Sequence, residues 1–288
     1  MTNQSNSQKI VERCYLNILR RKPDEAGLKH YTKLLESNEI DEDALIEQFK
    51  NSNEYKISHP TDLDPKQITT QERMRTDWNA RVIDDVKFAI RSVSSQSEKE
   101  FWDSGVIDCE SILGVNTPRN DLIIQGNDPK NMSILEIGCG IGRLIIPMSK
   151  IFGEVIGVDV SDEMVKLAKE KTSNITNCKI FQNSGSDISF LKDNYIDFCY
   201  SFIVFQHVPD KLIVENYIRE VSRVLKPQGI FRFQVRGNTE NKPTELTTWD
   251  GVSFSSKELH NYAKENNFKI LEEGDASEYF WVTFQLKE

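Results

Sequence analysis

Three glycines at alternate positions close a short apolar run in the middle of the chain. The segment ILEIGCGIGRLI carries them at Gly138, Gly140 and Gly142, with Glu136 shortly before the first. Glycines at the end of a buried strand let a ligand approach the backbone, and the free N–H groups of a following helix face such a ligand. Asp159 ends the next apolar run, EVIGVD, where its carboxylate is placed to accept both hydroxyls of a ribose. The spacing therefore predicts a nucleoside-containing ligand at the carboxyl ends of parallel strands.

Two nucleoside-containing ligands suit a glycine-rich turn of this kind: a nicotinamide or flavin dinucleotide, and S-adenosylmethionine. The dinucleotide pattern G-x-G-x-x-G serves a pyrophosphate, whereas this chain has E-x-G-x-G-x-G. The carboxylate of Glu136 would repel a pyrophosphate, but it suits a ligand that carries an ammonium and a sulfonium. The pattern therefore favours S-adenosylmethionine, and a tight turn without a ligand is the alternative that a glycine motif alone leaves open.

Around this turn, short β-rich runs alternate with helical stretches. Beyond Asp121 the strand candidates are SILEIG, EVIGVD, CKIFQN, IDFCYSF and GIFRFQV, and the helical stretches between them are GRLIIPMSKIF, SDEMVKLAKEK and DKLIVENYIREVSRVL. Such alternation predicts a parallel sheet with helices on both faces. Two late runs, FKILEEG and EYFWVTFQL, are close enough in sequence to pair antiparallel. Pro147 falls inside the first expected helix, where a proline ordinarily kinks the chain.

Composition limits the classes of partner. The chain has 288 residues and a formal charge of −9, which disfavours a nucleic-acid partner because phosphate binding relies on clustered Lys and Arg. No apolar run approaches the roughly 20 residues of a membrane span, and the start MTNQSNSQK has no apolar leader segment. The five cysteines include no C-x-x-C pair, and no carboxylate cluster suggests a metal. We therefore expect a reduced, cytoplasmic, metal-independent protein without a membrane span.

The stretch from about Asp121 to the C-terminus resembles the class I S-adenosylmethionine-dependent methyltransferases, specifically their small-molecule branch. The segments that carry the resemblance are, in order, ILEIGCGIGR, VIGVDVSDEMVKLAKEK, NSGSDISFLKDNYIDFCYSFIVFQHVPD and VLKPQGIFRFQV. The resemblance implies an α/β fold: a Rossmann-like, mostly parallel seven-stranded sheet with helices on both faces and an antiparallel last strand, together with an N-terminal all-α appendage. It also implies S-adenosyl-L-methionine as the cofactor and methyl transfer as the reaction.

The resemblance further implies which positions hold the cofactor. The expected set is Glu136, Gly138, Cys139, Gly140, Gly142, Asp159, Val160, Met164, Asp187, Ile188, Ser201 and Phe202. Within it, Glu136 and the glycines hold the methionine part, Asp159 holds the ribose, and the last two residues border the sulfonium. Met164 packs near the ribose and adenine, with plain core packing as its alternative. Asp187, followed by Ile188, meets the adenine, with the capping of a turn as its alternative. Nothing near Cys139 marks it as a reactive thiolate.

Two helices are predicted ahead of the sheet, between Thr70 and about Leu113, with a break over Ser94 to Ser97. The stretches TDWNARVIDDVKFAI and EKEFWDSGVIDCESIL resemble the helical lead-in of one subset of these methyltransferases. In that subset, such helices commonly cover the cofactor and form part of the acceptor pocket. The candidate lid residues are Trp78, Arg81, Phe101 and Trp102. The alternative is that the aromatic rings only pack against the sheet domain.

The first segment reads as short helices, in IVERCYLNIL, in RKPDEAGLKHYTKLL, and from Asp41 to Asn51. It resembles a small domain of unknown function, on the pattern Tyr15, Asn17, Leu19, Arg21, Pro23, Asp24, Gly27, Leu28 and Tyr31, closed by Asn51, Ser52, Glu54 and Tyr55. That domain often accompanies proteins linked to surface polysaccharides, which favours a glycan-related acceptor by association only. SHPTDLDPKQ, from Ser58 to Gln67, reads as a linker. We therefore predict a helical module over 1–60, a linker and helical lead-in over 61–120, and a methyltransferase domain over 121–288.

Methyl transfer from a sulfonium is an in-line displacement, so the protein contributes mainly alignment and exclusion of water. A hydroxyl acceptor also needs a base, and His207, in FQHVPD, is the histidine expected at the cofactor mouth. His30 and His59 fall in the N-terminal segment and His260 on a surface helix, and a structural ring bonded to the backbone is the alternative for His207. The sequence thus predicts methyl transfer to a small-molecule or glycan acceptor, at oxygen. The alternative is a binding or scaffold protein that keeps the fold without the activity.

Overall fold

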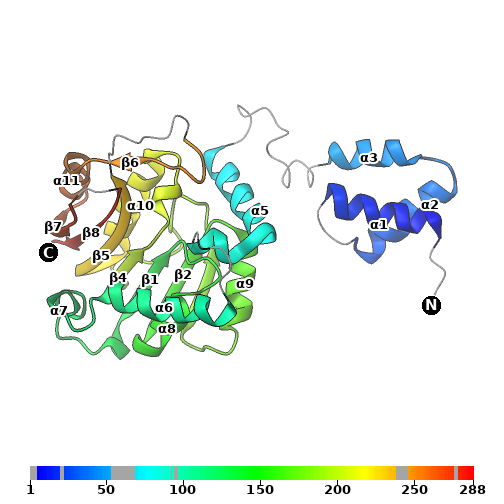
Figure 1. Ribbon diagram of the computed structural model, residues 1–288. Helices are drawn as coiled ribbons and strands as arrows, with labels where there is room; N and C mark the ends of the chain where they lie inside the picture. The colour runs from blue at the N-terminus through cyan, green and yellow to red at the C-terminus, as the bar shows by residue number, and fades with distance from the viewer. Residues whose placement is uncertain are drawn as a thin grey trace. The chain divides into compact units, whose positions relative to one another are not determined.

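The computed structural model describes residues 5–19, 23–52, 69–91, 93, 97–237, 246–275 and 278–288 (Figure 1). The chain divides into two compact units, a helical unit over Met1–Thr69 and an α/β unit over Thr70–Glu288. The linker predicted from Ser58 to Gln67 lies outside the described residues. So do three further residues that the sequence singled out: Arg21, Glu54 and Tyr55; His59 is part of that linker.

Three helices form the helical unit: α1 (Asn6–Ile18), α2 (Glu25–Glu36) and α3 (Glu42–Lys50). Each begins after a residue whose side chain accepts a backbone N–H of the first turn: Ser5, Asp24 and Asp41. Apolar side chains at helical spacing meet in one cluster, in which Val11, Leu45 and Phe49 are buried. A Cβ atom on Gly27 would lie 2.2 Å from the Tyr15 hydroxyl oxygen, so this close approach of α2 to α1 requires glycine. The predicted short helices are confirmed.

One sheet organises the α/β unit, in the strand order β3-β2-β1-β4-β5-β8-β7. Its strands are β1 (Ser133–Ile137), β2 (Glu154–Asp159), β3 (Cys178–Gln182), β4 (Ile196–Ser201), β5 (Leu225–Gly237), β7 (Phe268–Glu273) and β8 (Tyr279–Leu286). Neighbours pair in parallel except β8, which runs antiparallel to both β5 and β7. This confirms the predicted fold class. A short additional strand, β6 (Ser253–Phe254), pairs with the end of β5 and is too short to show a periodicity in the sequence.

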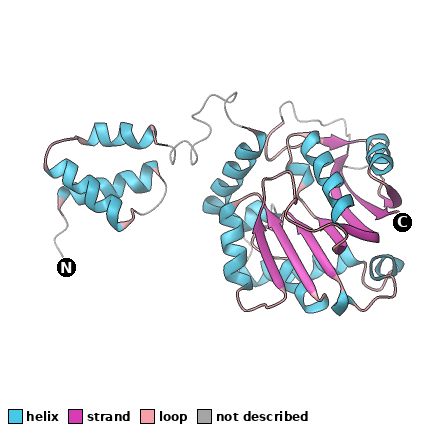
Figure 2. Cartoon of the chain, turned by 180° about the vertical axis from the view of Figure 1, so that it is seen from behind, coloured by secondary structure: helices cyan, strands magenta, loops and turns pink. Residues whose placement is uncertain are grey.

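Helices cover both faces of the sheet, as Figure 2 shows from behind. One face packs against α6 (Glu98–Leu113), α7 (Pro118–Ile124), α8 (Ile145–Ile151) and α9 (Asp162–Thr172). The other face packs against α10 (Lys211–Val224) and α11 (Ser256–Glu265). Alternate residues of β5 serve the two layers, because Ile230 belongs to the first core while Phe231 and Phe233 belong to the second. Two short 3₁₀ turns, η3 (Pro129–Asn131) and η4 (Phe205–His207), precede β1 and follow β4.

The two predicted lead-in helices are confirmed as α5 (Thr70–Arg91) and α6. Both belong to the α/β unit. Within α5, Asp85 has extended rather than helical backbone angles. Its carboxylate accepts the backbone N–H groups of Lys87 and Phe88, so it caps a short second segment of the helix. Ser97 and Glu100 form a capping box that starts α6.

Helix α8 begins later than the sequence pattern indicates. The pattern placed the helix directly after the glycines, which put Pro147 in its interior. In the structure, turns follow the glycines and the helix begins only at Ile145. Pro147 therefore stands in the first turn, where backbone N–H groups have no partner inside the helix and a proline costs little. The prediction that Pro147 lies in the helix interior and kinks it is therefore wrong.

Candidate functional site

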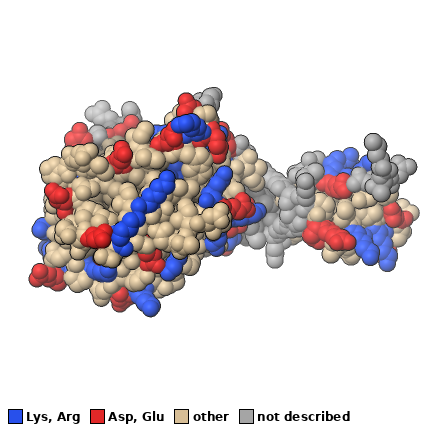
Figure 3. All heavy atoms as spheres, turned by 90° about the horizontal axis from the view of Figure 1, so that it is seen from below, with Lys and Arg blue, Asp and Glu red and all other residues tan. Residues whose placement is uncertain are grey.

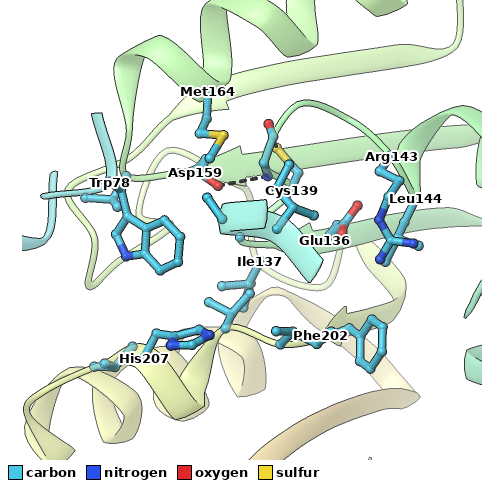
Figure 4. Close-up of a pocket in the computed structure, with 18 of the residues that line it drawn as sticks. Trp78, Glu136, Ile137, Cys139, Arg143, Leu144, Asp159, Met164, Phe202 and His207 are labelled. Carbon is cyan, nitrogen blue, oxygen red and sulfur yellow. Dashed lines mark hydrogen bonds between the residues drawn. The ribbon is translucent and has the colours of Figure 1, made fainter. Parts of the chain in front are cut away.

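A pocket opens near the carboxyl ends of β1, β2 and β4. The strand order reverses at β1, because β2 and β3 lie on one side of it and β4 and β5 on the other. Its empty space, with the open mouth included, is about 840 Å³. The predicted residues that line it are Trp78, Glu136, Gly138, Cys139, Gly140, Asp159, Val160, Met164, Phe202 and His207. Figure 4 shows Trp78 and His207 on one side and Glu136 and Arg143 on the other, with Asp159 between them.

The glycine turn is held against β2 and against the segment after β4. The N–H groups of Gly138 and Cys139 both donate to the Val158 carbonyl, at 2.8 and 3.0 Å. Gly138 has a φ of 76°, and a Cβ atom there would lie 2.3 Å from a methyl carbon of Val204. A side chain at Gly138 is therefore excluded both by backbone conformation and by space. Burial raises the pKa of the Cys139 thiol well above its usual range, so this thiol is not a nucleophile.

Asp159 is anchored by the backbone at the end of β2. Its Oδ2 accepts the N–H of Gly140 at 2.9 Å, drawn as a dashed line in Figure 4, and its Oδ1 accepts the N–H of Ser161 at 2.9 Å. Burial raises the pKa of Asp159 to about 6, against the opposing effect of these hydrogen bonds. At neutral pH the group is thus an oriented carboxylate, and each oxygen keeps a lone pair for a further donor.

Glu136 and Arg143 face the pocket at its other end. The Tyr200 hydroxyl donates to Glu136 Oε2 at 3.0 Å, and burial raises the pKa of Glu136 to about 8. Arg143 Nη1 donates to Asp108 Oδ2 at 2.6 Å and to Ser104 Oγ at 3.1 Å, which ties the glycine turn to α6. The buried Nε of Arg143 has no hydrogen-bond partner among the described residues. This end of the pocket therefore presents the carboxyl group of Glu136 beside the side chain of Arg143, whose guanidinium is tied to α6.

His207 ends the turn η4 and is buried, with 5% of its surface exposed. Its Nδ1 lies 2.6 Å from the carbonyl oxygen of Trp249. Because a carbonyl only accepts hydrogen bonds, Nδ1 carries the proton and Nε2 carries the lone pair. Gln206 Nε2 lies 3.4 Å from that Nε2. Burial, with a smaller effect of the charges of Arg81 and Arg236, lowers the pKa of His207 to about 4 against the opposing effect of the hydrogen bond to Trp249, so the ring is neutral at physiological pH.

The remaining predicted residues do not line the pocket. Gly142 closes the turn with its N–H on the Cys139 carbonyl, and Ser201 ties β4 to β1 through the Ile137 carbonyl. Ile188 is core, and Phe101 packs in a cluster with Met164. The carboxylate of Asp187 accepts hydrogen bonds from Ser184 and Ser189, as its turn-capping alternative requires. Trp102 donates to Glu98, and Arg81 donates to Thr248. The cofactor roles assigned to these positions stay predictions.

Several lining residues escaped the sequence reasoning: Met74, Ala89, Ile90, Ile137, Arg143, Leu144, Ile203, Val204, Val208 and Tyr217. Arg143 could have been predicted from the sequence, because it directly follows the glycine motif. The apolar residues of α5 had none beyond helical spacing. Ile203 stands out for its backbone: its φ of 57° is costly for a β-branched side chain. Such strain gathers at ligand sites, and here it turns the chain sharply from β4 toward η4.

The face drawn in Figure 3 shows the distribution of charged side chains, which bears on a nucleic-acid partner. There Lys and Arg are interspersed with Asp and Glu, and the described residues of this face form no continuous basic patch. Among the described residues, no set of three His, Cys, Asp or Glu side chains is grouped to hold a metal ion. No described helix has the length and apolar character of a membrane span. The absence of a nucleic-acid partner and of a metal stays a prediction.

Comparisons with known proteins agree with this site. Residues 135–233 match the family described as a methyltransferase domain, and residues 2–58 match a domain of unknown function, DUF4214. Demethylmenaquinone methyltransferases from Staphylococcus aureus (strain MRSA252) and Staphylococcus carnosus (strain TM300) are each 36% identical over 104 residues. Those residues are 35% of this chain and 42% of each relative, so the chain spans about two fifths of the length of these curated relatives.

Among solved structures, magnesium protoporphyrin IX methyltransferase from Synechocystis PCC 6803, with bound S-adenosylmethionine, superposes with a TM-score of 0.56. The match covers 78% of this chain and 100% of that one, at 16% sequence identity, so it shows a shared fold. The matched domain, the strand order and the position of the pocket lead to one conclusion. The chain carries a class I S-adenosylmethionine-dependent methyltransferase domain, preceded by a copy of the domain of unknown function.

Proposed function

We propose that the chain transfers a methyl group from S-adenosylmethionine to an oxygen atom of a small-molecule or glycan acceptor. The observation that carries this proposal is the placement of Asp159, Glu136 and the glycine turn around one pocket at the carboxyl ends of the strands. Burying carboxyl groups is costly, and the raised pKa values of Asp159 and Glu136 show that their hydrogen bonds do not offset this cost. A scaffold that never binds a ligand has no use for two of them in one cavity, so their presence favours an enzyme over the scaffold alternative.

The residues around the pocket fit the two ends of S-adenosylmethionine. Asp159 keeps a lone pair on each oxygen for the ribose hydroxyls, and Met164 and Val160 offer apolar surface beside it for the adenine. At the other end, the Glu136 carboxyl suits an ammonium, and the positive charge of Arg143 suits a carboxylate. A carboxyl and a guanidinium side by side match the zwitterion of an amino acid, which is what the methionine part of the cofactor presents.

When bound, S-adenosylmethionine supplies a methyl group on a sulfonium, which the acceptor oxygen displaces in line while the carbon–sulfur electrons return to sulfur. The chain's own contribution is alignment and the exclusion of water. Met74, Trp78 and Ile90 of α5 wall the pocket with apolar surface. His207 lines the pocket, and its unprotonated Nε2 lies 3.4 Å from the amide nitrogen of Gln206; we assign this Nε2 the acceptor's proton.

Two separate observations bear on the acceptor. Residues 2–58 match a domain that often accompanies polysaccharide-related proteins, which supports a sugar hydroxyl by association. The curated relatives are named for demethylmenaquinone, which supports a ring-bearing small molecule. The apolar wall that α5 contributes suits the nonpolar face of a ring of either kind. The acidic composition supports an enzyme without a nucleic-acid partner, and the absence of paired cysteine motifs from the sequence supports a cytoplasmic location.

Calorimetry with S-adenosylmethionine and with its demethylated product tests the cofactor site. Asp159→Asn keeps the size of the side chain but removes its charge, and hydrogen bonds to a charged group are worth about 1.5–3 kcal/mol each. We therefore expect affinity to fall at least about tenfold. Asp121→Asn, an exposed acid on α7, is the matched control and is expected to bind like the wild type. Unchanged affinity in Asp159→Asn refutes the assignment.

Transfer of a labelled methyl group to a panel of hydroxyl, carboxyl and amine compounds then tests the reaction. Label on oxygen supports the proposal, and label on nitrogen overturns the oxygen assignment. If the wild type binds neither form of the cofactor, the scaffold alternative replaces the proposed activity.

A further inference from the structure

Arg81 of α5 is fixed between two tryptophans and a backbone loop. Its guanidinium carbon lies 4.5 Å from the ring centre of Trp78 and 5.2 Å from that of Trp249. Its Nη1 donates to the Thr248 carbonyl at 3.1 Å, and its Nη2 donates to the Thr248 hydroxyl at 2.9 Å. Stacking and two hydrogen bonds from one planar group set both the position and the orientation of the loop relative to α5.

The loop held by Arg81, residues 247–252, lies directly on the turn that carries His207. The N–H of Gly251 donates to the Gln206 carbonyl at 2.8 Å, and the N–H of Val252 donates to the Val208 carbonyl at 2.8 Å. A Cβ atom on Gly251 would lie 2.4 Å from the Val208 carbonyl oxygen, so the two backbones are as close as glycine allows. The loop therefore contacts the chain immediately before and immediately after His207.

A second contact joins α5 to the same loop. The Thr248 hydroxyl, which accepts from Arg81, donates in turn to Asp77 Oδ2 at 2.5 Å. Asp77 and Arg81 are separated by one helical turn, so both side chains leave the same side of α5. Thr248 is thereby held by two residues of one helix, and it is buried, with 1% of its surface exposed.

The residue next to Thr248 supplies the hydrogen bond that selects the tautomer of His207. The Trp249 carbonyl accepts from His207 Nδ1, as described above, and the Trp249 ring lies 5.1 Å from the His207 ring at an angle of 38°. Trp78 meets the same imidazole edge to face, at 5.4 Å and 71°. A neutral imidazole has two tautomers, and a carbonyl at this place accepts a hydrogen bond from only one of them.

We propose that Arg81 is a positioning residue that sets the tautomer and orientation of His207 through Thr248 and Trp249. When Arg81 holds the loop, the Trp249 carbonyl keeps the proton on Nδ1 and leaves the lone pair of Nε2 toward the pocket. When the loop is released, both tautomers become accessible and the ring loses its fixed direction. The consequence for methyl transfer rests on the proposed function of His207 as the base, whereas the consequence for the tautomer does not.

Nitrogen-15 NMR of the imidazole side chains tests the inference on the full chain. The His207 signals are assigned by their loss in His207→Asn. In the wild type we expect a protonated Nδ1 and an unprotonated Nε2. In Arg81→Gln, which keeps a polar side chain but loses the planar double donor, we expect a mixture of tautomers at His207. Arg75→Gln on the same helix is the control, because Arg75 makes no hydrogen bond with the described residues.

Thr248→Val is a second variant, which keeps the shape of the side chain and removes only the hydroxyl that Arg81 and Asp77 share. It should shift the tautomer in the same direction as Arg81→Gln, and the double variant should add little, because the two groups act through one contact. An unchanged tautomer in both single variants, with the fold of the α/β unit intact, overturns the inference.

Cofactor affinity and transfer rate separate this inference from the proposed function. We expect Arg81→Gln to bind S-adenosylmethionine within about twofold of the wild type and to transfer methyl groups at least about tenfold more slowly, since misplacement of a catalytic group by an ångström costs up to roughly a hundredfold. A shifted tautomer with an unchanged rate supports the positioning role of Arg81 and refutes His207 as the base. A loss of cofactor affinity equal to the loss of rate overturns the inference, because Arg81 would then act on the cofactor side of the pocket.

Discussion

The structure predicts that cofactor affinity depends on pH through Glu136. This carboxyl group is buried, with 3% of its surface exposed, and it accepts a hydrogen bond from the neutral hydroxyl of Tyr200. Burial raises the pKa of Glu136 to about 8, although Tyr200 and the charge of Arg143 oppose the rise. The free protein therefore holds Glu136 mostly protonated at neutral pH. An ammonium group placed beside it favours the carboxylate, so binding below pH 8 must release a proton.

The size of the effect follows from the distance between the working pH and that pKa. At pH 7, one unit below a pKa of about 8, ionising Glu136 costs about 1.4 kcal/mol, and affinity is about tenfold weaker than its limit. The sign is fixed by the direction of the shift: affinity rises with pH and levels off above about 8. Below that value it falls by up to roughly tenfold per unit, until the lowered pKa of the complex is reached.

Calorimetry on the wild type and on Glu136→Gln checks this prediction. Glutamine resembles the protonated acid and has no charge to gain, so its affinity should be weak and should lack this dependence on pH. The amino group of the ligand titrates equally in both experiments, so the ratio of the two dissociation constants isolates Glu136. The dissociation constant of the variant divided by that of the wild type should rise between about pH 6 and about pH 8, and buffers of different ionisation enthalpy should report more proton release for the wild type than for the variant. A constant ratio over this range would refute the reasoning.

Two further predictions concern the domains and the base. A chain of residues 70–288 should fold and bind S-adenosylmethionine with the affinity of the full chain, because the cofactor pocket is built within the α/β unit; a truncated protein that is insoluble or does not bind would show that the helical unit belongs to the core. His207→Asn should slow transfer to a hydroxyl acceptor by roughly 10²–10⁴-fold while cofactor affinity holds, and a rate within about threefold of the wild type would return His207 to a structural role.

The sheet and the glycine turn were predictable because their signals are local. Each strand is a short apolar run bounded by turn formers, and Gly138 and Asp159 follow such runs directly. In a parallel sheet, residues that end neighbouring strands meet at one edge without further information. The late start of α8 was missed because several residues form turns between the glycines and the helix. Pro147 indicated this, because proline is favoured in the first turn of a helix.

The wall of the pocket was not predictable, because it depends on contacts between distant parts of the chain. Arg81 and Thr248 are 167 residues apart in sequence, and helical spacing gives no indication of which loop a helix meets. Trp249, which holds His207, was missed for the same reason. For Asp187 the structure shows the local turn, in which Ser184 and Ser189 donate to its carboxylate, while its role at the adenine stays a prediction.

The burial of His207 limits its strength as a base. Its pKa of about 4 lies some 2.5 units below the ordinary value of 6.5, so a protonated ring is about 3 kcal/mol less stable here than in water. Such a base does not remove the proton of an aliphatic hydroxyl before the displacement begins. As the carbon–oxygen bond forms, however, the acceptor oxygen gains positive charge and its proton becomes acidic enough for a weak base to take. His207 is thus suited to a hydroxyl whose proton leaves during the displacement. A carboxylate acceptor has no such proton and gains nothing from the ring, so the response to His207→Asn distinguishes the two classes of acceptor.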